Sequence, residues 1–184
     1  PNACVVSLAG DGVSDAPVLE TQGIRYTQLP IPAAAGQLFA GWYSTAEDAA
    51  AYNSAARVNG ADVVACTEQQ ITLYGSWMTP EQAAATPTEV PILMYHWMTE
   101  LPEGEDHWLK LNYIYTGDFD AQLGYIAEQG FYLPTWAELS SFIDGTLYLP
   151  PKSVIITDDD GDPTWFRLGE PIVDKHKLMT TAFI

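Results

Sequence analysis

Three adjacent aspartates, Asp158, Asp159 and Asp160, follow the apolar run 153–156 and precede Gly161. Carboxylates this close resist ionising together, so such a cluster usually binds a cation or takes part in proton transfer. The apolar run predicts a buried strand, and the glycine allows the chain to turn where that strand ends. Because α/β folds place their chemistry at strand ends, we expect two neighbouring carboxylates of this cluster to converge on one site.

Two alternatives to a metal or catalytic site can be compared with this cluster. An EF-hand loop with Gly161 at its sixth position would start at the ligand Ile156 and end at the ligand Arg167. Neither residue binds calcium, so the EF-hand is excluded. The second alternative is a strand-to-helix turn rich in capping residues, because carboxylates at a helix N-terminus are stabilised by the helix dipole. The residues by themselves leave this turn and the functional site equally open.

The composition excludes two classes of partner. Seven basic and 24 acidic side chains give a formal net charge of −17. This charge argues against nucleic acid, since phosphate binding needs a basic face, and against an anionic membrane surface. No stretch reaches the roughly 18 apolar residues that span a membrane, so no transmembrane segment is predicted. A hydrophobic content of 47% is enough for a packed core.

The two cysteines, Cys4 and Cys66, do not have the C-x-x-C spacing of a zinc knuckle. They are either buried thiols or one disulfide, and the sequence leaves both open. The chain begins at Pro1 rather than Met, so the lack of a signal peptide says little about targeting.

The first part of the chain, residues 1–78, is β-rich and punctuated by glycine and proline. Strands are predicted at 3–9, 38–43 and 70–77, and a short helix at 46–56. Residues 79–89 contain Pro80, three successive alanines and Pro87, a composition that indicates a linker, or a short helix followed by a linker. We therefore expect a domain boundary in that segment.

Strands and helices alternate in the second part of the chain, residues 90–184. Strands are predicted at 90–95, 153–157 and 180–184, and helices at 118–129, 135–143 and 163–176. Asp118 is expected to cap the first helix, and Thr135 with Glu138 fits a capping box for the second. This alternation implies a parallel sheet or a barrel.

The segment Thr157-x-Asp159-Asp160-Gly161 resembles the first motif of the polysaccharide deacetylases, the family 4 carbohydrate esterases with a NodB-type domain. Other segments resemble the same family, in the family's order. They are Pro91-Ile92-Leu93-Met94-Tyr95-His96, Phe119-x-x-Gln122-Leu123-x-Tyr125-Ile126, Leu149-Pro150-x-Lys152-Ser153-Val154, Pro171-Ile172-Val173-x-Lys175 and Thr181-Ala182-Phe183-Ile184. The resemblance covers about residues 90–184 and implies an α/β fold, the start of a distorted (β/α) barrel.

The resemblance also implies roles for individual residues. In that family the first Asp of the pair is a general base and the second binds a divalent metal, so Asp159 is expected to be the base and Asp160 a zinc ligand. A carboxylate placed in this way takes the proton of a water that attacks an acetyl carbonyl. Asp158 stands where the family usually has an aromatic or aliphatic residue. His96 is expected to line the site at the end of a strand, and its alternative is a hydrogen-bonded structural histidine.

One part of the family's metal site is missing from this sequence. The family completes the site with a downstream His-x-x-x-His motif, whereas the histidines here are His96, His107 and His176. The resemblance therefore implies that this chain carries only the first part of a catalytic domain. Either the natural protein continues past Ile184, or the site is degenerate.

A second resemblance concerns the first part of the chain. The segments Phe39-Ala40-Gly41-Trp42-Tyr43-Ser44 and Ile71-Thr72-Leu73-Tyr74-Gly75-Ser76-Trp77 resemble the Listeria–Bacteroides repeat of bacterial surface proteins. This resemblance spans about residues 3–78 and implies a small α+β module of β-grasp type, used for binding or spacing. Trp42 and Trp77 are equally expected in a packed core.

These observations combine into one expectation about organisation and function. We expect a repeat-like module at 1–78, a linker at 79–89 and the start of a deacetylase domain at 90–184, in a secreted or cell-surface bacterial protein. The expected activity is metal-dependent hydrolysis of N-acetyl, or O-acetyl, groups on a cell-wall or extracellular polysaccharide. The alternatives are a noncatalytic surface binding or spacer protein with a deacetylase-like scaffold, and an esterase that acts on acetylated plant polysaccharide.

Overall fold

The structure is a computed structural model, which describes residues 2–13, 16–27, 29–106, 108 and 110–184. The chain divides into two compact units. The first unit contains Pro1–Glu89 and Pro134–Pro151, and the second contains Val90–Leu133 and Lys152–Ile184. Residues 134–151 thus pack with the N-terminal part of the chain, whereas the sequence predicted a single domain at 90–184. The domain boundaries themselves stay a prediction.

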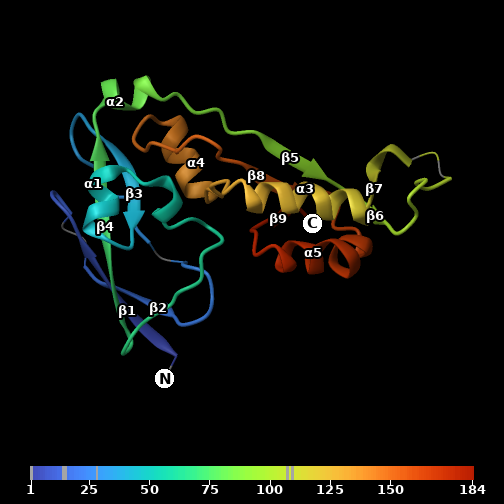
Figure 1. Ribbon diagram of the computed structural model, residues 1–184, viewed down its shortest axis with the longest axis horizontal. Coiled ribbons are helices and arrows are strands. Elements are labelled where there is room, and N and C mark those ends of the chain that lie inside the picture. The colour runs from blue at the N-terminus through green and yellow to red at the C-terminus, as the bar shows by residue number, and fades with distance from the viewer. Residues whose placement is uncertain (1, 14–15, 28, 107, 109) are drawn as a thin grey trace. The chain divides into compact units, whose positions relative to one another are not determined.

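A four-stranded mixed sheet in the order β2-β1-β4-β3 forms the centre of the first unit (Figure 1). Its strands are β1 (Ala3–Ala9), β2 (Val18–Thr21), β3 (Leu38–Tyr43) and β4 (Gln70–Met78). Strand β1 is parallel to β4, while the β1–β2 and β3–β4 pairs are antiparallel. The sequence predicted β1, β3 and β4 but missed the short β2. The first unit is therefore mixed α+β, and its membership of the β-grasp type stays a prediction.

The helices of the first unit follow their local capping signals. They are α1 (Ala46–Ala51), the 3-10 helix η1 (Ser54–Ala56), α2 (Pro80–Ala85) and α4 (Trp136–Ile143). The helix predicted at 46–56 is broken because Tyr52 adopts a left-handed conformation with φ 53°. The predicted capping box of α4 is confirmed, since the Thr135 hydroxyl accepts from the Glu138 N–H and the Glu138 carboxylate accepts from the Thr135 N–H.

The core of the first unit contains the two tryptophans of the repeat-like segments. The ring of Phe39 packs edge-to-face against Trp42 and Trp77, with ring centroids 5.1 and 5.3 Å apart. Cys4 and Cys66 form a disulfide, with their Cα atoms 6.1 Å apart. The question that the sequence left open between thiols and a bridge is therefore answered by the tertiary structure.

A buried arginine explains why residues 134–151 belong to the first unit. The guanidinium of Arg57 donates to the Tyr148 carbonyl at 2.7 Å and pairs with the Glu138 carboxylate at 3.2 Å. Gly41, with φ 109°, leaves room for this guanidinium, because a Cβ at that position would overlap it. Backbone hydrogen bonds join Phe39 to the same segment, from its N–H to the Thr146 carbonyl and from the Tyr148 N–H to its carbonyl.

The second unit is built on parallel strands. A three-stranded sheet has the order β5-β8-β9, and a separate two-stranded sheet joins β6 and β7. The strands are β5 (Ile92–Tyr95), β6 (Trp97–Thr99), β7 (Tyr113–Tyr115), β8 (Ile155–Asp158) and β9 (Thr181–Ala182). The helices are η2 (Lys110–Asn112), α3 (Thr116–Glu128), the π-helix η3 (Trp165–Gly169) and α5 (Glu170–Lys175). The predicted α/β class of this part is confirmed, while the barrel stays a prediction.

Two helix predictions in the second unit are wrong in detail. Helix α3 starts at Thr116 with Tyr115 at the N-cap position and no side-chain cap, so Asp118 lies in the first turn and does not cap it. The chain passes directly from β7 into the helix, which starts two residues earlier than predicted. The helix predicted at 163–176 is divided into η3 and α5, and Pro171 at the start of α5 has no N–H to donate.

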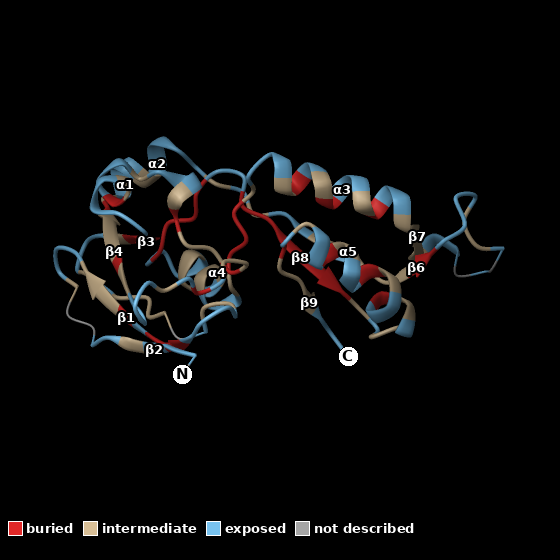
Figure 2. Cartoon of the chain, turned by 60° about the horizontal axis from the view of Figure 1, so that its bottom comes forward, coloured by how far each residue is buried: buried red, intermediate tan, exposed pale blue. Residues whose placement is uncertain are grey.

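Aromatic contacts close the core of the second unit. Phe119 of α3 contacts the rings of Tyr95 and Trp165, with centroids 4.8 and 5.7 Å apart. Helix α3 buries Phe119, Leu123 and Ile126, as the helical spacing predicted, and leaves its other face exposed (Figure 2). Among the helices that the structure describes, none combines the length and the apolarity needed to cross a bilayer.

Candidate active site at the end of β8

The aspartate cluster lies at the carboxyl end of β8, the middle strand of the three-stranded sheet. Every residue of β8 is buried, as Figure 2 shows. Asp158 is in register with Tyr95 on one side and Ala182 on the other. Just beyond the strand, the Asp159 N–H donates to the Tyr95 carbonyl at 2.9 Å, and the Phe183 N–H donates to the Asp158 carbonyl at 2.8 Å. Because parallel strands share a carboxyl edge, the three strands end together beside the cluster.

The turn after the strand depends on glycine. Asp160 has φ 76° and Gly161 has φ 59°, so two successive residues adopt the left-handed conformation. A Cβ at Gly161 would lie 2.5 Å from Cγ2 of Ile184. The turn that the sequence predicted at this glycine is present, and it leaves the Asp160 side chain exposed.

Asp158 lies on a different face of the sheet from the face that Thr157 occupies. Its register partner Tyr95 contacts Phe119, so the Asp158 side chain is directed to the face that α3 covers. Side chains alternate along a strand, which directs Thr157 to the opposite face, with Asp159 following it where the strand ladder continues. The fold therefore does not bring the three carboxylates to one point.

Burial gives Asp158 unusual electrostatics. The residue is 0% exposed, and neither carboxyl oxygen has a hydrogen-bond partner among the residues that the structure describes. This burial, together with the negative charges of Asp159, Asp162 and Asp160, raises the pKa of Asp158 to about 7. Asp158 is thus a buried carboxyl rather than a group that faces substrate.

Asp162 is a further acidic residue of this turn, and it was not among the candidates predicted from the sequence. Its carboxylate accepts hydrogen bonds from the N–H and the hydroxyl of Thr164, at 2.8 and 2.5 Å. The same hydroxyl accepts from the Met98 N–H at 2.9 Å, which joins β6 to the turn. The order Asp-Pro-Thr, in which an Asp side chain bonds its own backbone two residues on, was the available signal.

The three histidines have different surroundings. His96 follows β5 directly and is half-buried, so it lies at the same carboxyl edge as Asp159. His176 contacts the Asp120 carboxylate at 2.6 Å, on α3 and far along the chain from the cluster. His107 lies outside the described residues.

The residues present do not form a complete metal site. Within the described ranges, no group of three or more His, Cys, Asp and Glu side chains is arranged to hold a metal ion. Asp160, exposed at the tip of the turn, supplies one carboxylate donor. Its role as a zinc ligand, and the role of Asp159 as a base, stay predictions.

Comparison with known proteins found neither a matching family model nor a matching curated protein. Among solved structures, the chain is similar to Streptococcus pyogenes deacetylase PplD in complex with acetate, at 27% identity and a TM-score of 0.42, over 53% of this chain and 42% of that chain. It is similar to IcaB from Ammonifex degensii, at 28% identity and a TM-score of 0.43, over 53% and 39%. It is also similar to BC0361, a polysaccharide deacetylase from Bacillus cereus, at 20% identity and a TM-score of 0.40, over 61% and 33%.

These similarities cover less than half of each solved structure. The matched region spans 42% of the first of these chains and 39% of the second. All three TM-scores are below 0.5, so the function proposed for this chain rests on its own residues.

Proposed function

We propose that this chain carries the first part of a polysaccharide deacetylase site, with Asp159 as general base and Asp160 as one ligand of a divalent metal, zinc. The observation that carries the proposal is the placement of Asp159 and Asp160 at the carboxyl end of the middle strand of a parallel sheet. They lie on a left-handed turn that requires Gly161. Strand ends of this kind are where α/β folds place reacting groups.

The burial of Asp158 supports this choice among the three aspartates. Asp158 is enclosed on the helix-covered face and has no access to a substrate. The base and the metal ligand are therefore assigned to Asp159 and Asp160 rather than to Asp158 and Asp159. His96, at the neighbouring strand end, is proposed to line the same site.

The proposed reaction is hydrolysis of an acetamide. Asp159 takes a proton from a water while the water oxygen bonds to the acetyl carbonyl carbon. When the tetrahedral intermediate collapses, the carbon–nitrogen bond breaks, a proton passes to the nitrogen, and acetate and a free amine are released. A divalent cation would supply Lewis-acid stabilisation of the carbonyl oxygen. The remaining metal donors are not assigned, so no step is attributed to the metal.

The proposed substrate is an N-acetylated, or O-acetylated, cell-wall or extracellular polysaccharide, and the proposed location is outside a bacterial cytoplasm, in association with the cell wall. The disulfide Cys4–Cys66 supports this location, because disulfides persist in oxidising compartments. The first unit is proposed to be a Listeria–Bacteroides repeat-like module that accompanies the catalytic part.

Acetate release tests this proposal directly. The full natural protein is incubated with N-acetylglucosamine oligomers, with and without added zinc, and acetate is measured. Asp159→Asn should lower the rate by about 10²–10⁴-fold, the usual contribution of a general base. Asp174→Asn, an exposed carboxylate of α5, is the matched control and should keep the wild-type rate. Full activity in Asp159→Asn would show that another group is the base.

A noncatalytic surface binding or spacer protein is the second candidate. The observation that favours it is the lack of a three-donor metal group in the described ranges. Under this alternative, the full natural protein binds the polysaccharide and releases no acetate at any zinc concentration. An esterase of acetylated plant polysaccharide would instead release acetate from O-acetylated xylan and not from N-acetylglucosamine oligomers.

A further inference from the structure

A pocket in the first unit lies where β1 ends beside β4. Strand β1 pairs with β4 up to Ala9 and Tyr74, whereas β4 continues to Met78. At Gly10, with φ 138°, the chain turns away from β4, and a Cβ there would lie 2.6 Å from the Gly75 carbonyl oxygen. The edge of β4 beyond this point borders an open pocket of about 560 Å³.

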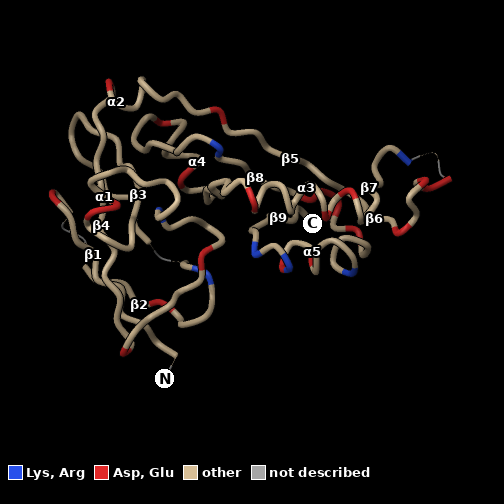
Figure 3. The backbone as a smooth tube through the Cα atoms, viewed as in Figure 1, with Lys and Arg blue, Asp and Glu red and all other residues tan. Residues whose placement is uncertain are grey.

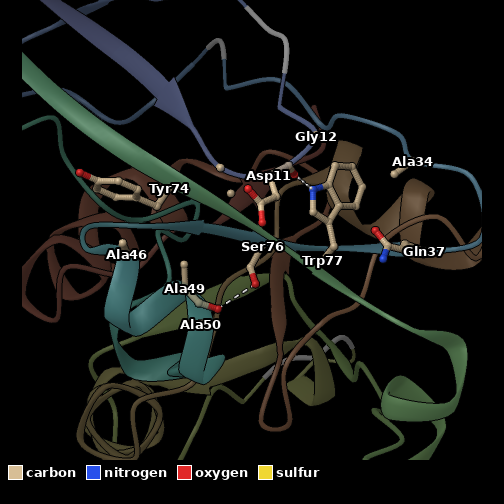
Figure 4. Close-up of a pocket in the computed structure, with 12 residues that line it drawn as sticks. Asp11, Gly12, Ala34, Gln37, Ala46, Ala49, Ala50, Tyr74, Ser76 and Trp77 are labelled. Carbon is tan, nitrogen blue, oxygen red and sulfur yellow. Dashed lines mark hydrogen bonds between the residues drawn. The ribbon is translucent and has the colours of Figure 1, made fainter.

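The pocket combines aromatic, polar and small side chains, which come from four different segments (Figure 4). Its lining includes Asp11, Gln37, Ala46, Ala50, Tyr74 and Trp77. The alanines belong to α1 and keep one wall low, so that the space above β4 stays open. The residues that line the pocket include no Lys, Arg or His.

Two hydrogen bonds hold the walls of the pocket in place. The indole Nε1 of Trp77 donates to the Asp11 carbonyl at 2.8 Å, and the Trp77 ring also packs against Phe39. The Ser76 hydroxyl donates to the Ala49 carbonyl at 2.7 Å, which joins α1 to β4. Both bonds are drawn in Figure 4. A pocket that is formed before a ligand arrives loses less entropy when the ligand binds.

The polar groups of the pocket are suited to hydroxyl groups. Asp11 and Gln37 are exposed, and no described residue makes a hydrogen bond to their side-chain atoms. A carboxylate and an amide offer acceptors, and the amide also offers donors, to neighbouring hydroxyls of one sugar ring. Tyr74 and Trp77 supply aromatic surface for the apolar face of such a ring.

Charge excludes one class of sugar. The pocket contains Asp11 and no basic group, and acidic residues are spread over the elements of both units (Figure 3), in a chain of net charge −17. An anionic sugar such as a uronate would be repelled by this field. The ligand that fits is therefore uncharged.

We propose that this pocket binds an uncharged pyranose unit, such as N-acetylglucosamine, within a polysaccharide. The choice of a polysaccharide as the source of the sugar rests on the proposed function. The pocket itself lies in the first unit and takes no part in the proposed reaction. Binding and hydrolysis can therefore fail independently.

Titration of the 184-residue chain with the N-acetylglucosamine trimer, followed by calorimetry or NMR, tests the proposal. We expect saturable binding by the wild-type chain and equal binding by Asp159→Asn. The galacturonate trimer should not bind. Absence of saturable binding of the N-acetylglucosamine trimer, or equal binding of the galacturonate trimer, would overturn the proposal.

A pair of alanine substitutions locates the binding. Ala50→Phe places a ring in the pocket and should weaken binding about tenfold or more, equivalent to about 1.4 kcal/mol. Ala51→Phe is the matched control, because Ala51 is exposed on the same helix and does not line the pocket. Circular dichroism verifies that both variants fold. Equal affinity of Ala50→Phe and wild type would refute this location, whereas glycan binding without acetate release would contradict only the proposed deacetylase activity.

Discussion

Asp158 illustrates how burial changes the meaning of a residue. An Asp beside two other aspartates looks like a member of their site, yet its side chain is enclosed with no hydrogen-bond partner among the described residues. Asp159 and Asp160 differ from it because one lies just past the strand and the other on an exposed left-handed turn. At this scale, access to solvent separates the candidate catalytic residues from the structural one.

The cost of burying this carboxyl leads to a stability prediction. Asp158→Leu replaces two oxygens by two methyl groups of similar shape, so the free energy of unfolding should rise by about 1–3 kcal/mol, the usual penalty for an unpaired buried polar group. Urea denaturation in the presence of a metal chelator measures the change. Asp160→Leu, at an exposed position, should not raise stability, and a lower unfolding midpoint for Asp158→Leu would contradict the prediction.

Pairing of elements explains which secondary structure was predictable. Strands β1, β3 and β4 and helix α4 carry their patterns in consecutive residues, and all were predicted. Strands β2, β6 and β7 are three or four residues long and exist because a partner strand lies beside them. Short strands are stabilised mainly by neighbours distant in the sequence, which a local pattern does not contain.

A link between α3 and α5 gives a pH prediction at the scale of elements. Hydrogen bonds from Lys175 and His176 lower the pKa of Asp120. The ionised carboxylate is therefore favoured in the folded state, so its contribution is present above its pKa in the unfolded chain and is lost as the pH falls through the lower folded pKa. Asp120→Asn should reduce stability at pH 7, and its difference from wild type should shrink below about pH 4.

Thermal unfolding between about pH 2 and pH 7 measures this difference across the range in which Asp titrates. Asp174→Asn, an exposed carboxylate next to Lys175, is the control and should follow the wild type across the range. A constant difference between Asp120→Asn and wild type down to the acidic end would show that the pairing with Lys175 and His176 does not contribute.

The disulfide acts at the scale of the whole chain, because its cysteines are 62 residues apart. Closing a loop of this length restricts the unfolded chain, and removing the bridge should lower the free energy of unfolding by about 4 kcal/mol. Urea denaturation of the wild type with and without dithiothreitol measures this loss. The Cys4→Ala, Cys66→Ala double variant should match the reduced wild type and should not respond to dithiothreitol. Equal midpoints for oxidised and reduced wild type would contradict the prediction.

The sequence by itself determined features that depend on neighbouring residues: the buried strand that ends in the aspartates, the turn at Gly161, the capping box of Thr135 and Glu138, and the alternation of strands and helices in the second part. Tertiary structure decided features that depend on distant contacts. It joined Cys4 to Cys66, packed residues 134–151 with the first unit through Arg57, and enclosed Asp158 under α3. The reason is physical: backbone propensity acts over a few residues, whereas burial, pairing and access to solvent are set by segments that meet only in the folded chain.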